Sequence, residues 1–351
     1  MVSPDHLTHS KAIQRRTGAT FHLATRFLPE RARHPTYVLY AFFRVADEVV
    51  DDPDPAPPAE QRQTLELFRA GALGDAAARE TLANREDGTA GADAAPVLEA
   101  FDELRRERGI DDHEVEVFID AMERDVVATD YENHEELSTY LRGSSVAVAN
   151  MMLAVMQPEE LEAARPHARA MAEAFQLTNF LRDVREDVVD YDRVYLPRSS
   201  LAEHGETIDA VRALEPTEGL LATIEDELAR TEDLYREGVA GIRYLPRGCQ
   251  AGVLMAAVLY AEHHRLIRDR GCDVFTARPS LSIRRRLALA ARTWYHWRRT
   301  GDPEAVFYRV SAVERHPEGE GSRASWPGFS VRSIANRPLA RLATVVPWGR
   351  D

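Results

Sequence analysis

The sequence has almost no lysine, little cysteine and no long uncharged apolar run. Lys11 is the single lysine, so arginine supplies nearly all of the 44 basic residues, while 58 acidic residues leave a net charge of −14. Nucleic-acid binding needs clustered basic side chains that neutralise phosphates, which makes so acidic a chain a poor candidate for it. Two explanations of the missing lysine stay open, namely a charged surface adapted to a salty cytoplasm or codon bias in a GC-rich genome.

The two cysteines, Cys249 and Cys272, are isolated from each other in the sequence. They form neither a disulfide framework nor a CxxC metal site, so we expect a reducing, cytoplasmic environment. Charges interrupt residues 1–20, where a secretory signal would need an apolar run. No stretch approaches the roughly 18 to 20 apolar residues of a membrane span. Any membrane contact is therefore expected to be peripheral.

Apolar residues recur at helical spacing over long stretches, which is typical of an all-α protein. Glycines and prolines collect in a few places, which argues against an all-β fold. The predicted helical segments are 37–50, 97–104, 115–127, 168–188, 220–239, 251–267 and 287–297. Residues 71–95, rich in Ala, Gly and Asp, are expected to form a flexible loop. We predict one large helical domain over residues 1–300 and an irregular extension over 301–351.

Two segments each place four polar side chains on one face of an otherwise apolar helix. In the first segment these are Tyr40, Arg44, Asp47 and Asp51, at offsets of four, three and four residues. In the second they are Gln176, Asn179, Asp183 and Asp187, at offsets of three, four and four. Residues three or four apart on a helix lie on the same side. Each segment therefore predicts one polar stripe.

Both stripes contain two aspartates four residues apart, whose like charges repel on a helix. Burying such a pair is costly unless a cation compensates the charge. Hard oxygen ligands without His or Cys nearby favour Mg²⁺ or Mn²⁺, which usually shares its shell with water and substrate phosphate. With Arg44 and Arg182 close by, the two stripes predict a diphosphate clamp that contains several metal ions. A single DxxxD pair is common on solvated helices, so the prediction depends on having two.

The two stripes resemble motifs of the squalene/phytoene synthase family, the head-to-head branch of the all-α isoprenoid synthases. The segment YAFFRVADEVVDD resembles the first aspartate-rich motif of that family. The segment QLTNFLRDVREDVVDYDRVYLP resembles the second motif with the Arg-x-Tyr-Leu-Pro signature that follows it. The resemblance extends from about Ser10 to Thr300 and is greatest to the phytoene-forming members. It implies the isoprenoid synthase fold, a single large helical bundle around a central cavity.

The resemblance also implies a role for individual residues. The implied metal ligands are Asp47, Asp51, Asp183 and Asp187. The implied catalytic residues are Tyr40, Arg44, Tyr140, Arg182 and Tyr260, and the implied substrate-binding residues are Phe21, Arg44, Gln176, Asn179, Arg182 and Arg278. Phe21 belongs to an N-terminal flap that covers the site in the family. The sequence departs from the family pattern at Glu48, where many relatives have Asp, and at residues 190–192, where they commonly carry basic residues and a glycine.

The activity that the resemblance implies is condensation of two geranylgeranyl diphosphates to phytoene, through a cyclopropylcarbinyl diphosphate and with release of diphosphate. This is an early step of carotenoid synthesis, so downstream carotenoid enzymes are expected partners of a monomer or weak homodimer. A squalene- or dehydrosqualene-forming enzyme that uses farnesyl diphosphate stays open as the alternative, because one sequence does not show pocket depth. Retained aspartates argue against a non-catalytic scaffold, and a di-iron bundle would need Glu-x-x-His pairs.

An allylic cation, formed when diphosphate leaves, needs a dry wall with electron-rich faces. The aromatic candidates for this wall are Phe21, Tyr40, Phe42, Phe43 and Tyr140. For each of them taken alone, packing in the core is favoured. Tyr40 and Tyr140 are the exceptions, because the resemblance implies active-site tyrosines there and Tyr40 also lies in a stripe.

The segment from Arg284 to Arg299 is basic and aromatic inside an acidic chain. Basic amphipathic helices suit anionic membrane surfaces, so the segment is a candidate for peripheral contact with a bilayer. The alternative is an ordinary helix with a solvated arginine face.

Overall fold

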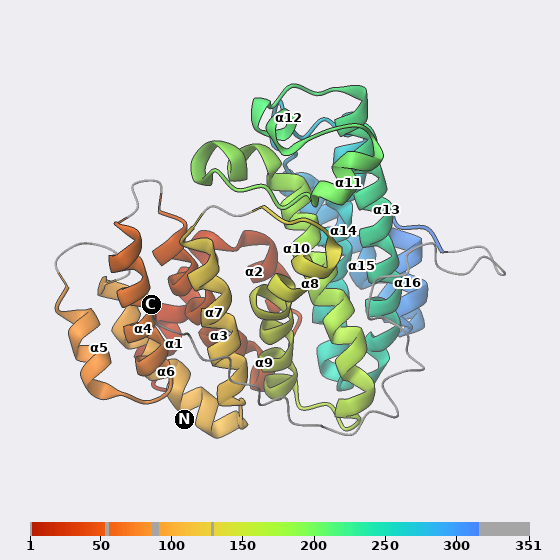
Figure 1. Cartoon of the computed structure of the whole chain (residues 1–351). Helices are drawn as coiled ribbons and strands as arrows, with labels where there is room; N and C mark the ends of the chain where they lie inside the picture. The colour runs from red at the N-terminus through yellow and green to blue at the C-terminus, as the bar shows by residue number, and fades with distance from the viewer. Residues whose placement is uncertain (1, 53–55, 86–90, 128–129, 316–351) are drawn as a thin grey trace, which may run out of the picture.

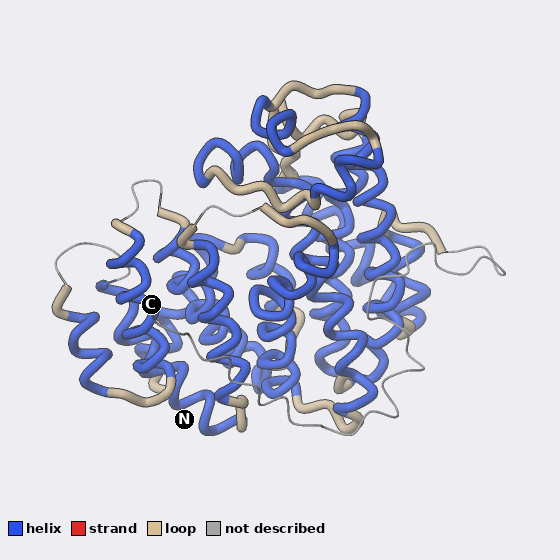
Figure 2. The backbone as a smooth tube through the Cα atoms, in the orientation of Figure 1, coloured by secondary structure: helices blue, strands red, loops and turns tan. Residues whose placement is uncertain are grey.

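The computed structural model describes residues 2–52, 56–85, 91–127 and 130–315, and every regular element within these ranges is a helix (Figures 1 and 2). The α-helices are α1 (Pro4–Thr17), α2 (Ala19–Thr25), α3 (Glu30–Val50), α4 (Pro58–Ala72), α5 (Ala76–Ala83), α6 (Gly91–Arg108), α7 (Asp112–Asp125), α8 (His134–Leu141), α9 (Ala147–Met156), α10 (Leu161–Tyr191), α11 (Arg198–Glu203), α12 (Ile208–Ala213), α13 (Glu218–Ala240), α14 (Arg247–Arg268), α15 (Ile283–Thr300) and α16 (Pro303–Val310). A π-helical turn at Arg142–Val146 joins α8 to α9, and a 3₁₀ turn at Gly241–Tyr244 follows α13. The all-α prediction is confirmed.

Six of the seven predicted helical segments lie wholly in helices and the seventh does so up to Asp125, although several helices extend beyond the apolar repeat. α3 already begins at Glu30, and α10 runs over 31 residues from Leu161. α7 ends at Asp125, two residues before the predicted end of its segment. Helix ends are set by caps and tertiary contacts, which periodicity alone does not report.

The predicted flexible loop over residues 71–95 is wrong for most of its length. Residues 76–83 form α5, and α6 begins at Gly91. The Asp75 carboxylate caps α5 by accepting hydrogen bonds from the backbone N–H groups of Ala77 and Ala78. Leu82 anchors the helix in the core with none of its surface exposed. Alanine is the best helix former, so the composition that indicated a loop in fact favours a short capped helix.

The predicted irregular structure after Gly301 is also wrong where the structure describes it. Asp302 caps α16, and the side chains of Val306 and Phe307 are buried. α16 packs against α13, α14 and α15, so the helical bundle continues past residue 300. A helix of two turns is too short to produce a clear repeat. Residues 316–351 of the predicted extension lie outside the described residues.

The helices are arranged in two sides with a layer between them. In Figure 1 the N-terminal helices α3 to α7 form one side, α13 to α16 the other, and α8 to α10 lie between. A second, smaller core cluster under α11 and α12 contains Leu201, Ile208 and Val211, and it holds the segment that follows α10 through Val194 and Leu196. None of the helices in the described ranges combines the length and apolar character needed to cross a membrane.

Candidate active site

A cavity of about 890 Å³ lies between the two sides of the bundle. α10 runs along the cavity, and the residues that it contributes to the lining change from apolar to acidic along the helix. The residues that α10 contributes from its first half are mostly apolar, such as Ala168 and Met171, while those from its last three turns include Asp183 and Asp187. At a rise of 1.5 Å per residue, Ala168 and Asp187 are about 28 Å apart. The cavity is therefore long, with an acidic end and an apolar end.

The first predicted stripe faces this cavity from α3. Its members Tyr40, Arg44, Asp47 and Asp51 all line the cavity. The Tyr40 hydroxyl lies 3.2 Å from the hydroxyl of Thr17, and Arg44 donates from Nε to Oε1 of Glu48 at 3.1 Å. A Cβ atom on Gly18 would lie 2.4 Å from the Tyr40 hydroxyl oxygen. Glycine at the α1–α2 junction thus leaves room for the Tyr40 ring.

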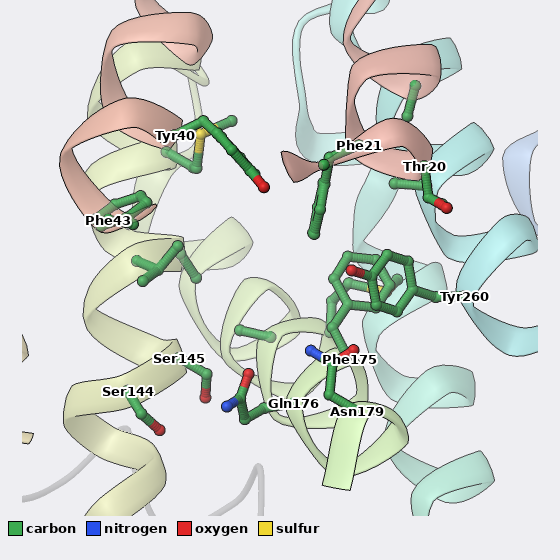
Figure 3. A pocket seen from close by; sticks show the side chains of 18 of the residues that line it. Thr20, Phe21, Tyr40, Phe43, Ser144, Ser145, Phe175, Gln176, Asn179 and Tyr260 are labelled. Atoms are coloured by element: carbon green, nitrogen blue, oxygen red, sulfur yellow. The ribbon is translucent and has the colours of Figure 1, made fainter. Parts of the chain in front are cut away.

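The second stripe faces the same cavity from α10. Its members Gln176, Asn179, Asp183 and Asp187 line the cavity, as do Arg182 and Glu186. Figure 3 shows Gln176 and Asn179 extending from α10 toward the open space. Oδ1 of Asn179 is buried without a hydrogen-bond partner among the described residues. Such an oxygen is costly unless a ligand or water completes it.

Arginines surround the carboxylates of the second stripe. Arg182 Nε donates to Oδ1 of Asp183 at 2.7 Å. Arg278, from the loop before α15, contacts Oδ1 of Asp183 at 2.7 Å and Oε2 of Glu186 at 2.6 Å. The structure therefore brings the three predicted phosphate-binding arginines, including Arg44, to the acidic end of the cavity.

Electrostatic repulsion links the two stripes. Burial and then the Asp51 carboxylate raise the pKa of Asp47 well above its ordinary value. Burial, followed by the carboxylates of Asp183 and Asp51, raises the pKa of Asp187 in the same way. Asp51 belongs to α3 and Asp187 to α10, so the two acidic faces are close enough to repel each other. Neighbouring carboxylates of this kind favour binding of a cation.

The residues present fit a divalent cation that is completed by substrate. The donors are hard carboxyl oxygens, and burial with neighbouring acids raises the pKa values of Asp47 and Asp187, an effect that a bound cation would oppose. Within the described ranges, however, no three His, Cys, Asp or Glu side chains gather closely enough to hold a metal ion. Magnesium commonly completes its coordination with phosphate oxygens and water, which agrees with carboxylates that do not form a closed cage.

Arg193 connects the ends of the two stripes, a role that the sequence did not indicate. It lies just after α10 and is only 6% exposed. Its Nη1 donates to Oδ1 of Asp51 at 2.7 Å, and its Nη2 donates to the carbonyls of Val50 and Asp125. Residues 190–192, which depart from the family pattern, directly precede Arg193. Through its own hydrogen bonds, Arg193 connects the end of α10 to α3 and α7.

Tyr140 lines the cavity and is held by a carboxyl group that sequence reasoning missed. Its hydroxyl donates to Oδ2 of Asp125 at 2.7 Å, and both side chains are buried. Burial raises the pKa of Asp125 to about 7, against the opposing effects of Arg193 and the hydrogen bond from Tyr140. An aspartate at the end of an apolar helix repeat was the one available signal for this residue.

Aromatic rings form the wall beside the polar groups. Phe21 of α2 lies 5.0 Å from Tyr260 and 6.2 Å from Tyr40 between ring centroids. Phe175, which the sequence did not single out, lies 4.8 Å from Tyr260. Figure 3 shows these rings around one part of the cavity, with Phe43 on the α3 side. Their π faces are available to a cation in an otherwise water-poor space.

Phe42 was a candidate for the wall, but core packing was favoured for it, and the structure confirms that it packs in the core. Its side chain is fully buried, away from the cavity, and stacks on Phe101 at 3.7 Å between ring centroids. Two residues along a helix turn a side chain by about 200°, so Phe42 cannot share the direction of Tyr40.

His263 adds a neutral group to the lining. It is buried, and its Nδ1 lies 3.1 Å from the carbonyl oxygen of Tyr260. Burial, with the nearby charge of Arg182, lowers the pKa of His263 to about 4. The imidazole is therefore uncharged at neutral pH.

Comparisons with known proteins agree with this geometry. Residues 14–285 match the family described as squalene/phytoene synthase. The chain is 31% identical over 278 residues to a phytoene synthase of Cereibacter sphaeroides, covering 78% of this chain and 75% of the relative. It is 32% identical over 292 residues to a phytoene synthase of Thermus thermophilus, covering 83% and 93% of the two chains. A crystal structure of a dehydrosqualene synthase with ligand superposes with a TM-score of 0.69 at 22% identity, covering 84% of this chain and 97% of the other, and so shares its fold. The chain belongs to the squalene/phytoene synthase family.

Proposed function

We propose that the protein is a phytoene synthase, which joins two geranylgeranyl diphosphates head to head and releases diphosphate. The observation that carries this function is a single long cavity with two opposed aspartate stripes at one end and apolar walls at the other. The polar end suits a diphosphate and the apolar end suits a prenyl chain. Its volume of about 890 Å³ lies near the top of the roughly 300–1,000 Å³ usual for small-molecule pockets.

The four aspartates of the stripes would hold Mg²⁺ or Mn²⁺, namely Asp47, Asp51, Asp183 and Asp187. The bound cations supply Lewis-acid stabilisation of the departing diphosphate. Arg44, Arg182 and Arg278 add fixed positive charge that binds the phosphate oxygens. Because negative charge on these oxygens grows as the carbon–oxygen bond breaks, such contacts strengthen toward the transition state.

The aromatic residues protect the carbocation that remains. Phe21, Tyr40 and Tyr260 place π faces on the cavity, each worth about 0.5 to 2 kcal/mol to a nearby cation. α2 carries Phe21 over the cavity and excludes water, so the cation is captured by the second prenyl chain. Tyr140 and Asp125 orient each other on the opposite wall. Gln176 and Asn179 offer amide groups to the bound diphosphate or its water shell.

The experiment that tests this function is incubation of the purified protein with geranylgeranyl diphosphate in detergent micelles, with and without Mg²⁺, followed by hydrocarbon analysis. We expect phytoene only when Mg²⁺ is present. Farnesyl diphosphate in a parallel reaction tests the alternative squalene- or dehydrosqualene-forming activity. A C30 hydrocarbon from farnesyl diphosphate, with no product from the C20 substrate, would replace the proposal by that alternative.

We propose a cytoplasmic location and a monomer or weak homodimer that passes its hydrocarbon to downstream carotenoid enzymes. The two isolated thiols support the reducing location, since Cys249 and Cys272 are buried and unpaired in the described structure. Sedimentation velocity of the purified chain tests the oligomeric state.

A further inference from the structure

α15 carries most of the large apolar side chains that are exposed in the described structure. Six such side chains are exposed, and four belong to this helix: Ile283 at 61%, Leu287 at 54%, Trp294 at 41% and Tyr295 at 55%. The other two, Val127 and Val189, are single residues on other elements. Scattered exposed apolar residues are ordinary, but four on one 18-residue helix form a patch.

The patch borders the side of α15 that packs on the protein. Leu289, Thr293 and Trp297 are buried, and the helix contacts α14 and α16. Ile283, Leu287 and Trp294 fall within an arc of about 40° on the helix surface, at 100° per residue. Buried Trp297 lies about 40° to the other side of Ile283, so α15 has one wide apolar face, and the described part of the chain leaves the edge formed by the stripe exposed.

Positive charge lies along one side of the exposed stripe. The helix contains six arginines and no acidic residue, in a chain with a net charge of −14. Arg284, Arg292, Arg298 and Arg299 are exposed, and no described carboxylate forms an ion pair with any of them. The Arg298 guanidinium stacks 5.7 Å from the Trp294 ring centre, and Arg299 lies 5.5 Å from that of Tyr295.

The same face adjoins the rim of the cavity. Arg278 lines the cavity and is 46% exposed, and Leu281 and Arg286 line it where α15 begins. Farther along, Trp294 packs on Phe27 with 5.4 Å between ring centroids. Phe27 follows α2, the helix that carries Phe21 into the cavity. The exposed stripe is thus continuous with the segments that enclose the site, at the end of the molecule opposite to α5 (Figure 1).

We infer that this face of α15 docks on the surface of an anionic lipid bilayer. Its apolar stripe enters the headgroup region, its Trp and Tyr rings lie at the interface, and its arginines contact acidic headgroups. The contact itself depends only on this surface. Its purpose rests on the proposed function, because a C20 diphosphate and a hydrocarbon without polar groups both partition into a bilayer beside the cavity rim.

Two other partners could cover this face of α15, but both fit its positive charge less well. A second copy joined by two-fold symmetry would place this arginine-rich face against itself, which like charges oppose. The chain's own residues 316–351 contain five arginines and three acidic residues, so they lack the negative charge that would complement the helix. Acidic lipid provides negative charge and an apolar layer together.

The test is co-sedimentation of the full chain with vesicles, at physiological salt. We expect binding to vesicles of phosphatidylglycerol mixed with phosphatidylcholine, and little binding to phosphatidylcholine alone. The double variant Arg284→Gln/Arg298→Gln should reduce the partition coefficient about thirty-fold, since each arginine near an anionic surface contributes about five-fold. Ile283→Ser/Leu287→Ser should also weaken binding, and both pairs are exposed enough for the fold to tolerate the changes.

The matched control is Arg62→Gln/Arg106→Gln, which removes two exposed arginines from α4 and α6. Asp102, the partner of Arg106, keeps Arg79 and Arg105. This variant should bind vesicles within about two-fold of wild type. If the control and test variants lose vesicle binding equally, the loss is explained by the change in net charge alone, and the inference is overturned. Wild-type binding that is absent, or equal on both vesicle types, would overturn it as well.

Trp294 gives a local readout. Brominated phosphatidylglycerol should quench tryptophan fluorescence in wild type, and Trp294→Phe should lose that part of the quenching. A dimer that dissociates in Ile283→Ser/Leu287→Ser, without vesicle binding, would assign the face to a second copy instead.

Activity in detergent micelles should be unchanged in the α15 variants. Micelle activity tests the proposed function and vesicle binding tests the docking face, so failure of one is distinguishable from failure of the other.

Discussion

Asp125 and Tyr140 form a hydrogen bond of 2.7 Å on the cavity wall, and the aspartate also lies near Arg193 and Asp51. A buried carboxyl group in this position resists ionisation, because water is excluded and other acids are close. The pair shows how the acidic end of the cavity is organised beyond the two stripes. Each added carboxylate raises the cost of the unliganded state and increases the attraction for cations.

The stability of the protein should fall as the pH rises through the titration of Asp125. Its pKa rises from 3.8 to about 7 on folding, so the folded state holds the proton more tightly. That stabilisation is present below pH 3.8 and is lost between about pH 4 and 7. Urea denaturation of wild type and Asp125→Asn over this range should therefore show wild type losing stability relative to the variant. The opposite slope would show that Asp125 is not protonated in the fold.

Asp47→Asn and Asp183→Asn should each lower turnover by at least about a hundred-fold, the scale for losing one preorganised electrostatic group. The melting temperature of Asp47→Asn should not fall, because Asp47 belongs to a repulsive acidic cluster. That of Asp183→Asn should fall, because Arg182 and Arg278 lose a carboxylate partner. Asp209→Asn, on the exposed side of α12, is the matched control and should retain activity. Hydrocarbon yield and thermal unfolding measure the two effects. Full activity in either stripe variant would remove that aspartate from the site.

At the scale of elements, α16 shows what a periodic pattern fails to detect. α16 has only eight residues, which is too short for a clear apolar repeat, so the sequence did not predict that Phe307 is buried. Its side chain is buried against Tyr235, with 6.0 Å between the ring centroids. Phe307→Ala should cost about 3 to 5 kcal/mol of unfolding free energy. The exposed neighbour Arg309→Ala should cost less than about 0.5 kcal/mol. Equal unfolding free energies for the two variants would mean that α16 does not belong to the bundle.

The junction between α1 and α2 gives a second test at this scale. A Cβ atom on Gly18 would overlap the Tyr40 ring, so Gly18→Ala should displace that ring and destabilise the fold by about 1 to 3 kcal/mol. Combining it with Tyr40→Ala should recover part of the loss, because the overlapping atoms are then absent. The two changes should therefore be non-additive in a double-mutant cycle. Additive losses would show that the two residues do not meet.

Long helices with a repeated apolar face could be predicted from the sequence, and so could the two stripes, because three- and four-residue offsets fix a common face. The sequence also predicted that both stripes line one cavity, because each stripe lies on one helix face and buried acidic side chains need a compensating cation. Short capped helices such as α5 could not be predicted from the sequence, since caps and tertiary contacts determine whether such a helix forms. Arg193 and Phe175 were missed because their roles depend on which distant helices meet, and a single sequence does not report that.

For the whole molecule, we propose that α3 and α10 hold opposite sides of one cation-dependent diphosphate site. In Figure 1 α3 belongs to the N-terminal side of the bundle and α10 to the layer between the two sides, yet the Asp51 carboxylate contributes to the raised pKa of Asp187 across the cavity. Neither stripe is a complete site by itself, because no three of the described acidic or histidine side chains form a metal cage. Cation and diphosphate should consequently bind together and depend on both helices.

Isothermal titration calorimetry with inorganic diphosphate measures this dependence directly. The account predicts weak binding of Mg²⁺ alone, weak binding of diphosphate alone, and at least ten-fold tighter binding of diphosphate when Mg²⁺ is present. Asp47→Asn on α3 and Asp183→Asn on α10 should each abolish the enhancement. Diphosphate affinity that is independent of Mg²⁺, or an enhancement that survives both substitutions, would contradict the account.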